Sequence, residues 1–404
     1  MRIAIINMVH YGSTGKIMLQ TAEVARKAGY DVKTYSSIPF SVRGKMDVPQ
    51  IENHYVWGSF FENGVHYALG STLGRNGCYS KRGTRKLIRD LQAFKPDLIH
   101  LHNLHVFCIN LPMLFRHIKK HNIPVIWTLH DCWTFTGNCA HFTLAKCNGW
   151  RTGCGNCPQL EAYPKSRIDN SKFMYRRKQK WFTGVQDLTI VTPSNWLAGL
   201  VGESFLKDYP VKVIHNGIDL TVFKPTESDF RKKHGCEGKF ILLGVAFGWG
   251  VRKGLDVFVE LASRLDDRFQ IVLVGTDDAV DRNLPEGIIS IHRTQNQAEL
   301  AEIYTAADLF VNPTREDNYP TVNMESLACG TPVVTFRTGG SPECIDPTCG
   351  SVVPCDDIDA LEQEILRIAE IKPYSTDACL NKAKEFDMNQ RFEEYVKLYD
   401  EARK

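Results

Sequence analysis

The chain has 404 residues, of which 43% are hydrophobic and 24% charged, and its formal net charge at pH 7 is +3. This length exceeds what one hydrophobic core usually organises, so two domains are expected. No apolar run reaches the roughly 18 residues that a bilayer-spanning helix needs, which argues against an integral membrane protein. The 13 Cys are an odd number and no secretory signal pattern precedes them, which favours a reducing cytoplasm over a disulfide framework.

The charge is distributed unevenly along the chain. Residues 1–220 hold 28 Lys and Arg against 14 Asp and Glu, a net charge of +14, whereas residues 221–404 hold 21 against 32, a net charge of −11. Basic runs lie at residues 79–91 and 165–180, and the second run leads into Trp181 and Phe182. Basic faces with apolar edges are attracted to anionic bilayers, so a membrane surface or another polyanion is the expected partner. Solvated helix faces are the alternative.

The first 36 residues predict a βαβ unit, because an apolar strand leads through a glycine-rich loop into a helical pattern and a second strand. Such a loop often cradles phosphate. A Walker-type loop would need Gly at position 10 and Ser or Thr at position 17, where the chain has His10 and Ile17. A kinase or ATPase is therefore disfavoured.

Two later strands end in histidine next to a polar residue. One ends at His102 and Asn103, and the other, residues 125–129, ends at His130 and Asp131. Functional groups gather at the carboxyl ends of parallel strands, so His130 is a candidate catalytic residue. His100, His102 and Asn103 are candidates for acceptor contacts.

Four cysteines lie within nineteen positions and close on a Cys-x2-Cys pair: Cys139, Cys147, Cys154 and Cys157. Four thiolates satisfy a closed tetrahedral zinc site, so a structural Zn2+ is expected, with no open position for catalysis. Free thiols that pack as small hydrophobic groups are the alternative.

The second half contains two loops that can bind a nucleotide sugar. Arg252 and Lys253 end a glycine-rich loop before a helix, where two cations repel the helix dipole unless an anion lies between them, which predicts a diphosphate site. An acidic loop follows a later strand, and a helix begins after Pro320. Asp317 and Glu325 are eight positions apart, so both can face one cavity, one for sugar hydroxyls and one for a ribose diol.

Residues 317–334, DNYPTVNMESLACGTPVV, resemble the acidic signature of the family 4 glycosyltransferases. The resemblance implies a retaining, nucleotide-sugar-dependent enzyme of α/β class with the GT-B fold, two Rossmann-like domains facing across a central cleft. The family usually has Glu at the first acidic position, where this chain has Asp317 with Glu316 one step before it. Either carboxylate can be the sugar contact. The Gly12–Gly15 turn and the cysteine-rich segment resemble colanic-acid-type members.

The resemblance also implies a domain organisation. Residues 1–222 would form the acceptor-side domain, with a cysteine-rich insert at about 132–160. Residues 223–386 would bind the nucleotide sugar, and residues 387–404 would form a helix that crosses back to the first domain.

The expected site residues follow from the same resemblance. The expected catalytic residues are His130, Lys253, Asp317 and Glu325. The expected donor contacts are Gly12, Ser13, Gly15, Arg252, Lys253, Arg293, Asn318, Thr321, Val322 and Glu325.

The implied donor is a UDP- or GDP-sugar used without a catalytic metal. The implied acceptor is a lipid-linked saccharide at the inner face of the cytoplasmic membrane, in the synthesis of a bacterial surface polysaccharide. Nucleic acid is not an expected partner, and the oligomeric state is left open. The alternatives are a nucleotide-sugar 2-epimerase of the same fold and a zinc-dependent nucleic-acid-binding protein.

Overall fold

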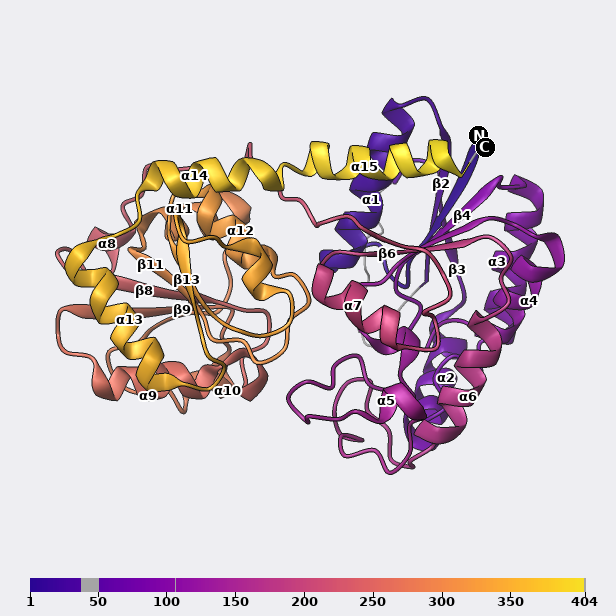
Figure 1. Cartoon of the computed structure of the whole chain (residues 1–404), viewed down its shortest axis with the longest axis horizontal. Coiled ribbons are helices and arrows are strands. Elements are labelled where there is room, and N and C mark those ends of the chain that lie inside the picture. The colour runs from indigo at the N-terminus through magenta and orange to yellow at the C-terminus, as the bar shows by residue number, and fades with distance from the viewer. Residues whose placement is uncertain (38–50, 106, 403–404) are drawn as a thin grey trace. The chain divides into compact units, whose positions relative to one another are not determined.

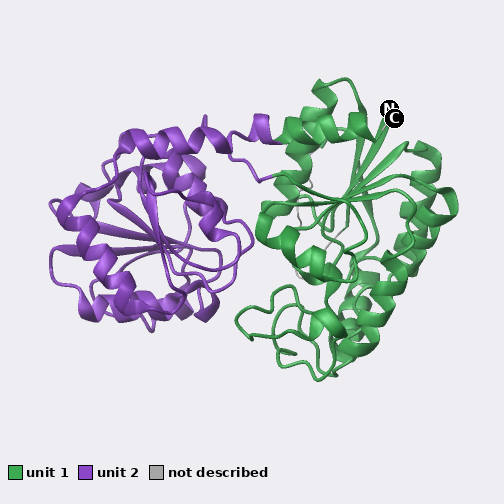
Figure 2. Cartoon of the chain, in the orientation of Figure 1, with its two compact units in different colours: residues 1–214, 392–404 green, residues 215–391 purple. Residues whose placement is uncertain are grey.

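The computed structural model describes residues 1–37, 51–105 and 107–402, which form two compact units (Figures 1 and 2). Unit 1 comprises Met1–Ile214 and Phe392–Lys404, and unit 2 comprises His215–Arg391. The limit expected from the sequence, after residue 222, lies a few residues further along the chain.

Unit 1 is built on a seven-stranded parallel sheet with the order β3-β2-β1-β4-β5-β6-β7. Its strands are β1 (Arg2–Ile6), β2 (Asp31–Ser37), β3 (His54–Trp57), β4 (Leu98–Leu101), β5 (Val125–Thr128), β6 (Leu188–Thr192) and β7 (Val211–Val213). Its helices are α1 (Gly12–Lys27), α2 (Phe60–Leu73), α3 (Lys81–Phe94), α4 (Leu111–His121), η1 (Trp133–Phe135), α5 (Gly149–Thr152), α6 (Ser171–Phe182) and α7 (Asn195–Glu203).

Unit 2 is built on a six-stranded parallel sheet with the order β10-β9-β8-β11-β12-β13. Its strands are β8 (Phe240–Val245), β9 (Phe269–Val274), β10 (Ile289–Ile291), β11 (Leu309–Asn312), β12 (Val333–Phe336) and β13 (Gly350–Val353). Its helices are α8 (Phe230–Lys233), η2 (Val251–Lys253), α9 (Leu255–Arg264), α10 (Asp278–Asp281), α11 (Gln297–Ala306), α12 (Thr321–Ala328), η3 (Ser341–Cys344), α13 (Ile358–Ile371), α14 (Thr376–Ala383) and η4 (Lys384–Phe386).

Both sheets have the doubly wound topology that the alternating sequence pattern predicts. Central strands such as β1 and β9 are near-continuous apolar runs because helices cover both faces of a parallel sheet. The strand order reverses between β1 and β4 in unit 1 and between β8 and β11 in unit 2. The loops that follow these four strands therefore diverge at the carboxyl edge and leave room for a ligand.

The last helix, α15 (Met388–Glu401), ends in unit 1. Its apolar side packs into that unit through Phe392, Tyr395 and Tyr399, which are buried. The Tyr399 hydroxyl is hydrogen-bonded to His100 Nδ1 at 2.7 Å, and the Tyr395 hydroxyl accepts a hydrogen bond from Thr128. His100, in β4, is therefore a structural residue of this contact.

The second basic run forms α6, but its aromatic residues do not reach the surface. Trp181 is 9% exposed and Phe182 is fully buried against Trp127 and Phe115. The expectation that Trp181 and Phe182 seat at a membrane interface is wrong, because the amphipathic helix turns its aromatic side toward the sheet. Among the helices of the described residues, none has the length and apolar character needed to cross a bilayer.

Candidate active site

The loop after β8 carries Arg252 and Lys253 in the short helix η2, just before α9. Gly254 follows with a positive φ of 75°, and a Cβ at this position would lie 2.4 Å from the Pro313 carbonyl oxygen. Glycine is therefore required here. The loop that carries Arg252 and Lys253 therefore packs tightly against the loop after β11. These two loops follow β8 and β11, the strands between which the strand order reverses, a position called the switch point of the sheet.

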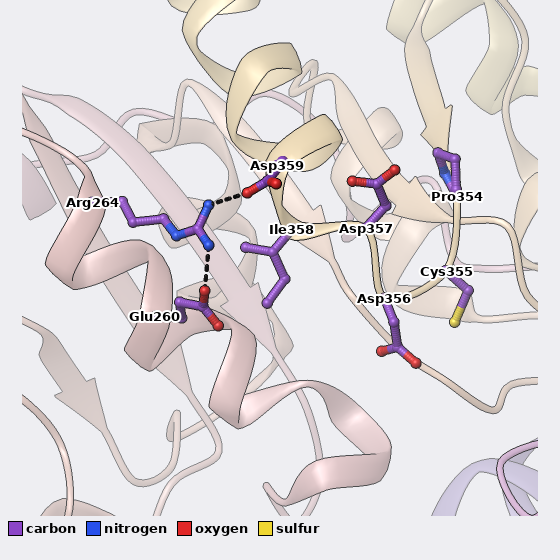
Figure 3. Close-up of a pocket in the computed structure, with 8 residues that line it drawn as sticks. All are labelled: Glu260, Arg264, Pro354, Cys355, Asp356, Asp357, Ile358 and Asp359. Atoms are coloured by element: carbon purple, nitrogen blue, oxygen red, sulfur yellow. Dashed lines mark hydrogen bonds and ion pairs between the residues drawn. The ribbon is translucent and has the colours of Figure 1, made fainter.

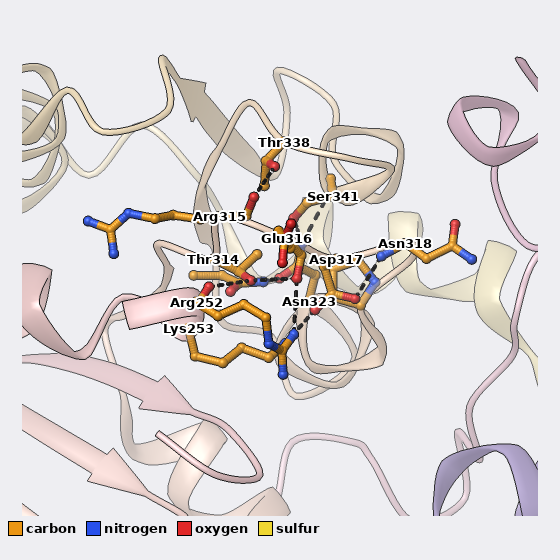
Figure 4. Close-up of polar contacts among 12 residues, drawn as sticks. Arg252, Lys253, Thr314, Arg315, Glu316, Asp317, Asn318, Asn323, Thr338 and Ser341 are labelled. Atoms are coloured by element: carbon orange, nitrogen blue, oxygen red, sulfur yellow. Dashed lines mark hydrogen bonds and ion pairs between the residues drawn. The ribbon is translucent and has the colours of Figure 1, made fainter. Parts of the chain in front are cut away.

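The two loops are joined by an ion pair and a hydrogen bond (Figure 4). Lys253 Nζ lies 2.5 Å from Asp317 Oδ2, and each of the two side chains is about one-fifth exposed. Arg252 Nη1 donates to the Glu316 carbonyl oxygen at 3.2 Å. The structure thus brings Arg252, Lys253 and Asp317 together, and it pairs Lys253 with Asp317 while the Glu316 side chain is buried.

Arg315 holds the acidic loop in place through contacts with Arg252, Asp256 and Asp356, a role that the sequence pattern did not predict. Its backbone N–H donates to the Arg252 carbonyl oxygen at 2.9 Å. Its guanidinium binds both carboxylate oxygens of Asp256 at 2.8 Å and also pairs with Asp356. The sequence did carry a signal, since an arginine directly precedes two acidic residues.

The remaining predicted donor contacts of unit 2 follow the acidic loop. Asn318 is buried, and Thr321 and Val322 open α12, whose N-cap Pro320 provides no side-chain cap. Glu325 lies one turn into α12 and accepts a hydrogen bond from the buried Tyr304 hydroxyl at 3.2 Å. Burial and the Glu325 carboxylate both raise the pKa of Tyr304, so it stays a hydrogen-bond donor.

Arg293 is exposed in the loop after β10. The neighbouring His292 pairs with Asp281 at 2.6 Å, and that contact raises the pKa of His292. Within the described residues, no ion pair links Arg293 to the Lys253–Asp317 pair.

In unit 1, the loop after β1 makes a tight entry into α1. Gly12 has a φ of 68°, and a Cβ on Gly15 would lie 2.5 Å from the His10 carbonyl carbon, so both positions need glycine. Ser13 is exposed beside them, and Tyr11 at the N-cap gives no side-chain cap. The start of α1 therefore presents backbone N–H groups in a glycine-shaped turn, a geometry that suits an anion.

His130 lies at the end of β5, next to the residues that follow β4. Its Nε2 is 3.0 Å from His102 Nδ1, and the two rings are stacked. Burial lowers the pKa of His130 to about 4, so the imidazole is neutral at pH 7. His102 is fully buried, and its Nε2 has no hydrogen-bond partner among the described residues.

Asp131 organises the same edge of the sheet. Its Oδ2 accepts from Asn103 Nδ2 at 3.2 Å and lies 2.8 Å from His105 Nε2, and its Oδ1 accepts from the Trp133 N–H. Burial by itself raises the pKa of Asp131, but the charge and hydrogen bond of His105 outweigh it and lower the pKa to about 2. Asp131 is therefore an anchor for the loops around His130.

The structure does not support the zinc site that the cysteine spacing predicts. Among the residues that the structure describes, no three His, Cys, Asp or Glu side chains are arranged to hold a metal ion. Cys139 is buried in the core of unit 1, where burial raises its pKa to about 12, and the Cys154 sulfur accepts a hydrogen bond from the Gly137 N–H at 3.1 Å. Cys147 and Cys157 are half-buried. Thiols buried to this extent can pack as small hydrophobic groups, so zinc is not supported.

Unit 2 also has an open pocket of about 500 Å³ beside α9 and α13 (Figure 3). Its lining residues are Glu260, Arg264, Pro354, Cys355, Asp356, Asp357, Ile358 and Asp359. Arg264 pairs with Glu260 and, at 2.6 Å, with Asp359, while Asp356 pairs with Arg315. A lining with four carboxylates repels a diphosphate, so this pocket does not suit the donor.

Comparison with known families decides the class of protein. The model of Glycosyltransferase Family 4 matches residues 15–222, and the model described as Glycosyl transferases group 1 matches residues 239–370. The chain belongs to glycosyltransferase family 4. The protein is therefore a glycosyltransferase, as the acidic signature predicted.

Individual relatives agree with this family. The glycosyltransferase is 27% identical over 322 residues to WcaC of Escherichia coli K12, a glycosyl transferase named for colanic acid biosynthesis, and the match covers 75% of this chain and 76% of that protein. It is 32% identical over 270 residues to a D-inositol 3-phosphate glycosyltransferase of Arthrobacter sp. FB24, covering 62% and 56% of the two chains.

Solved structures confirm the predicted GT-B fold with two Rossmann-like domains. Sucrose-phosphate synthase from Thermosynechococcus elongatus superimposes with a TM-score of 0.71 at 16% identity, covering 99% of this chain and 98% of that one. Anabaena Alr3699/HepE, solved in complex with UDP, gives a TM-score of 0.68 at 14% identity, covering 99% and 100%. At these identities the likeness shows the fold alone.

Proposed function

We propose that this glycosyltransferase moves a sugar from a UDP- or GDP-sugar, with retention of anomeric configuration, to a lipid-linked saccharide during synthesis of a bacterial surface polysaccharide. The observation that carries the proposal is the Lys253–Asp317 pair at the switch point of unit 2. A cation for the leaving diphosphate and a carboxylate for sugar hydroxyls stand side by side there. The UDP complex of the structural neighbour Alr3699/HepE supports a nucleotide-sugar donor.

The leaving group would be stabilised mainly from unit 2. Lys253, Arg252 and the first N–H groups of α12, at Thr321 and Val322, would face the negative charge that develops on the diphosphate. In the free protein Lys253 neutralises Asp317. A bound diphosphate would compete for the ammonium group and leave Asp317 to accept hydrogen bonds from the sugar. Asn318, next to Asp317, would add a sugar contact.

Other residues would complete the donor site. Glu325, fixed by the Tyr304 hydroxyl, would accept hydrogen bonds from the ribose, and Arg293 would lie near the base. The turn formed by Gly12, Ser13 and Gly15 would offer N–H groups to the diphosphate. These roles would be shared by an acceptor-side domain of residues 1–222 and a donor-side domain of residues 223–386, with residues 387–404 as the returning helix; the compact units change over a few residues away, at 214/215 and 391/392.

His130 would lie near the reacting carbon of the sugar and would be uncharged. Its lowered pKa of about 4 means that it does not add a positive charge at pH 7. A neutral imidazole whose Nε2 is held by His102 can exchange hydrogen bonds with a hydroxyl group and still avoid repelling the cations of the donor site.

The proposed acceptor follows from charge and from the named relative. Residues 1–220 carry a net charge of +14, which suits a pyrophosphate-linked lipid among anionic headgroups at the inner face of the cytoplasmic membrane. WcaC, the relative named for colanic acid biosynthesis, supports a polysaccharide product.

The first experiment is a thermal-shift screen of UDP- and GDP-sugars, followed by transfer assays. One nucleotide sugar should raise the Tm, and NMR of the product formed on a polyprenyl-diphosphate saccharide should show the donor's anomeric configuration. Incubation with the donor alone tests the epimerase alternative, because an epimerase would change the donor sugar without an acceptor. A protein that no nucleotide sugar stabilises, or a product with inverted configuration, would overturn the proposal.

A further inference from the structure

Helix α2 (Phe60–Leu73) exposes its apolar side chains to solvent. The exposed apolar residues are Phe60, Phe61, Val65, Tyr67 and Leu69, and Phe61 is 81% exposed. Positions 61, 65 and 69 recur every four residues, so they form one stripe along the helix. Isolated exposed apolar residues are ordinary, but a continuous stripe on a single helix marks an interaction surface.

The opposite, buried side of α2 is polar or small: Asn63, His66 and Gly70. His66 Nε2 accepts from the Gly77 N–H at 3.2 Å, which leaves His66 Nδ1 to donate to Ser80 Oγ at 2.8 Å. Ser80 Oγ in turn donates to Asn63 Oδ1 at 3.2 Å. This buried chain of hydrogen bonds fixes the rotation of the helix, so the apolar stripe cannot turn inward without leaving polar groups unpaired.

The start of α3 (Lys81–Phe94) lies directly beside the start of α2. The Glu62 carboxylate accepts hydrogen bonds from the Arg82 N–H at 2.7 Å and the Gly83 N–H at 2.8 Å, and thereby caps α3. The exposed cations of α3 are Lys81, Arg82, Arg85, Lys86 and Arg89. Within the described residues, none of these five side chains forms an ion pair.

We propose that α2 and α3 together form a docking surface for an anionic lipid bilayer: the apolar stripe of α2 enters the headgroup region and the cations of α3 bind lipid phosphates. This inference rests on the proposed membrane-linked acceptor and identifies the surface that reaches it. Apolar insertion and cation binding reinforce one another at such an interface. The surface replaces Trp181 and Phe182, which are buried.

Charge argues for a bilayer over a second copy of the chain. A twofold-symmetric contact through this surface would oppose the α3 cations of one copy to those of the other, and like charges repel. An anionic bilayer offers negative charge to the cations of α3 and an apolar interior to Phe61 and Val65 of the α2 stripe.

Vesicle flotation with matched variants of the full chain tests the surface. Phe61→Ser with Val65→Ser removes the centre of the stripe, and Leu366→Ser with Ile371→Ser removes two exposed apolar residues from α13 of unit 2 as a control. All four side chains are exposed, so the fold should persist, and the Tm of each variant checks this.

A second pair of variants tests the cations. Arg85→Gln with Arg89→Gln removes two charges from α3, and Arg176→Gln with Lys180→Gln removes two exposed charges from α6 as the matched control. Each cation near an anionic surface is worth about fivefold in binding, so the α3 variant should bind roughly 25-fold more weakly.

The wild-type chain should float with vesicles of phosphatidylcholine and phosphatidylglycerol in equal parts and much less with phosphatidylcholine alone. The α2 and α3 variants should lose at least tenfold in binding, and the α13 and α6 controls should lose much less. If the wild type floats with neither vesicle, the membrane-linked acceptor itself fails. If the wild type floats but the α2 variant floats equally well, or the α6 variant loses as much as the α3 variant, only this docking surface is overturned. A wild-type dimer in light scattering that the α2 variant abolishes, without vesicle binding, would assign the stripe to a second copy of the chain.

Discussion

Replacing Lys253 with methionine tests the core of the proposed mechanism. The Lys253 ammonium lies 2.5 Å from Asp317 in the free protein, and its side chain is about one-fifth exposed. Methionine keeps an unbranched apolar chain in the same place but removes the charge. The variant therefore isolates electrostatic stabilisation of the leaving diphosphate from the packing of the loop.

The effect on activity should be much larger than the effect on stability. Removing one preorganised group that stabilises transition-state charge costs about 100- to 1000-fold, or about 3 kcal/mol. The Lys253–Asp317 pair is partly exposed to water. Its loss should cost about 1 kcal/mol of unfolding free energy, because water still reaches the remaining carboxylate. Lys253→Met should thus fold normally and lose about two to three orders of magnitude in kcat/KM with the best donor from the thermal-shift screen.

The control is Arg264→Met, which removes a cation of the same unit that pairs with Glu260 and Asp359 away from the proposed site. It should keep wild-type kcat/KM. A double variant, Lys253→Met with Asp317→Asn, separates the two roles of the lysine. If Lys253 only neutralises Asp317, the double variant should have nearly the same kcat/KM as Asp317→Asn alone, because the asparagine carries no charge to neutralise. If Lys253→Met retained kcat/KM within about threefold of the wild type, the diphosphate assignment would have to be abandoned.

Three further outcomes are expected. Asp317→Asn should lower kcat/KM more than Glu316→Gln in side-by-side kinetics, and the reverse order would assign the sugar contact to Glu316. Gly254→Ala should lower the free energy of unfolding in urea by about 1 to 3 kcal/mol, since a Cβ there meets the Pro313 carbonyl in a left-handed backbone, and an unchanged midpoint would contradict the close packing of the two loops. Burial lowers the pKa of His66 to about 3, below its unfolded value of about 6.5, so the unfolded chain binds more protons between these values and stability falls as the pH drops below 6.5. His66 alone should cost about 2 kcal/mol of stability at pH 5 relative to pH 7, in addition to the losses from other buried histidines such as His130. A His66→Gln variant should therefore lose less stability between pH 7 and pH 5 in urea unfolding than the wild type, and an equal loss in both would refute the buried neutral His66.

The sequence by itself determined the architecture. Alternation of apolar strands with helical patterns required parallel sheets, because a strand buried on both faces is apolar throughout. Glycine and proline positions located the turns, and α12 begins after Pro320 as predicted. The acidic signature from Asp317 onward identified the family. These features are local, so neighbouring residues are enough to fix them.

The contacts between distant segments were decided only by the tertiary structure. Lys253 meets Asp317 because β8 and β11 are adjacent at the point where the strand order reverses, and spacing along the chain carries no record of that adjacency. Arg315 gained its supporting role for the same reason.

The direction in which a helix faces was likewise beyond the sequence. The aromatic residues Trp181 and Phe182 follow a basic run, yet the sheet takes them into the core, whereas α2 turns Phe61 outward because the buried hydrogen bonds of His66 hold the other side in. The cysteine spacing predicted zinc, but the fold draws Cys139 into the core. The periodicity of a sequence predicts that a helix has two unlike sides. Only the surfaces against which the helix packs decide which of these sides is exposed to water.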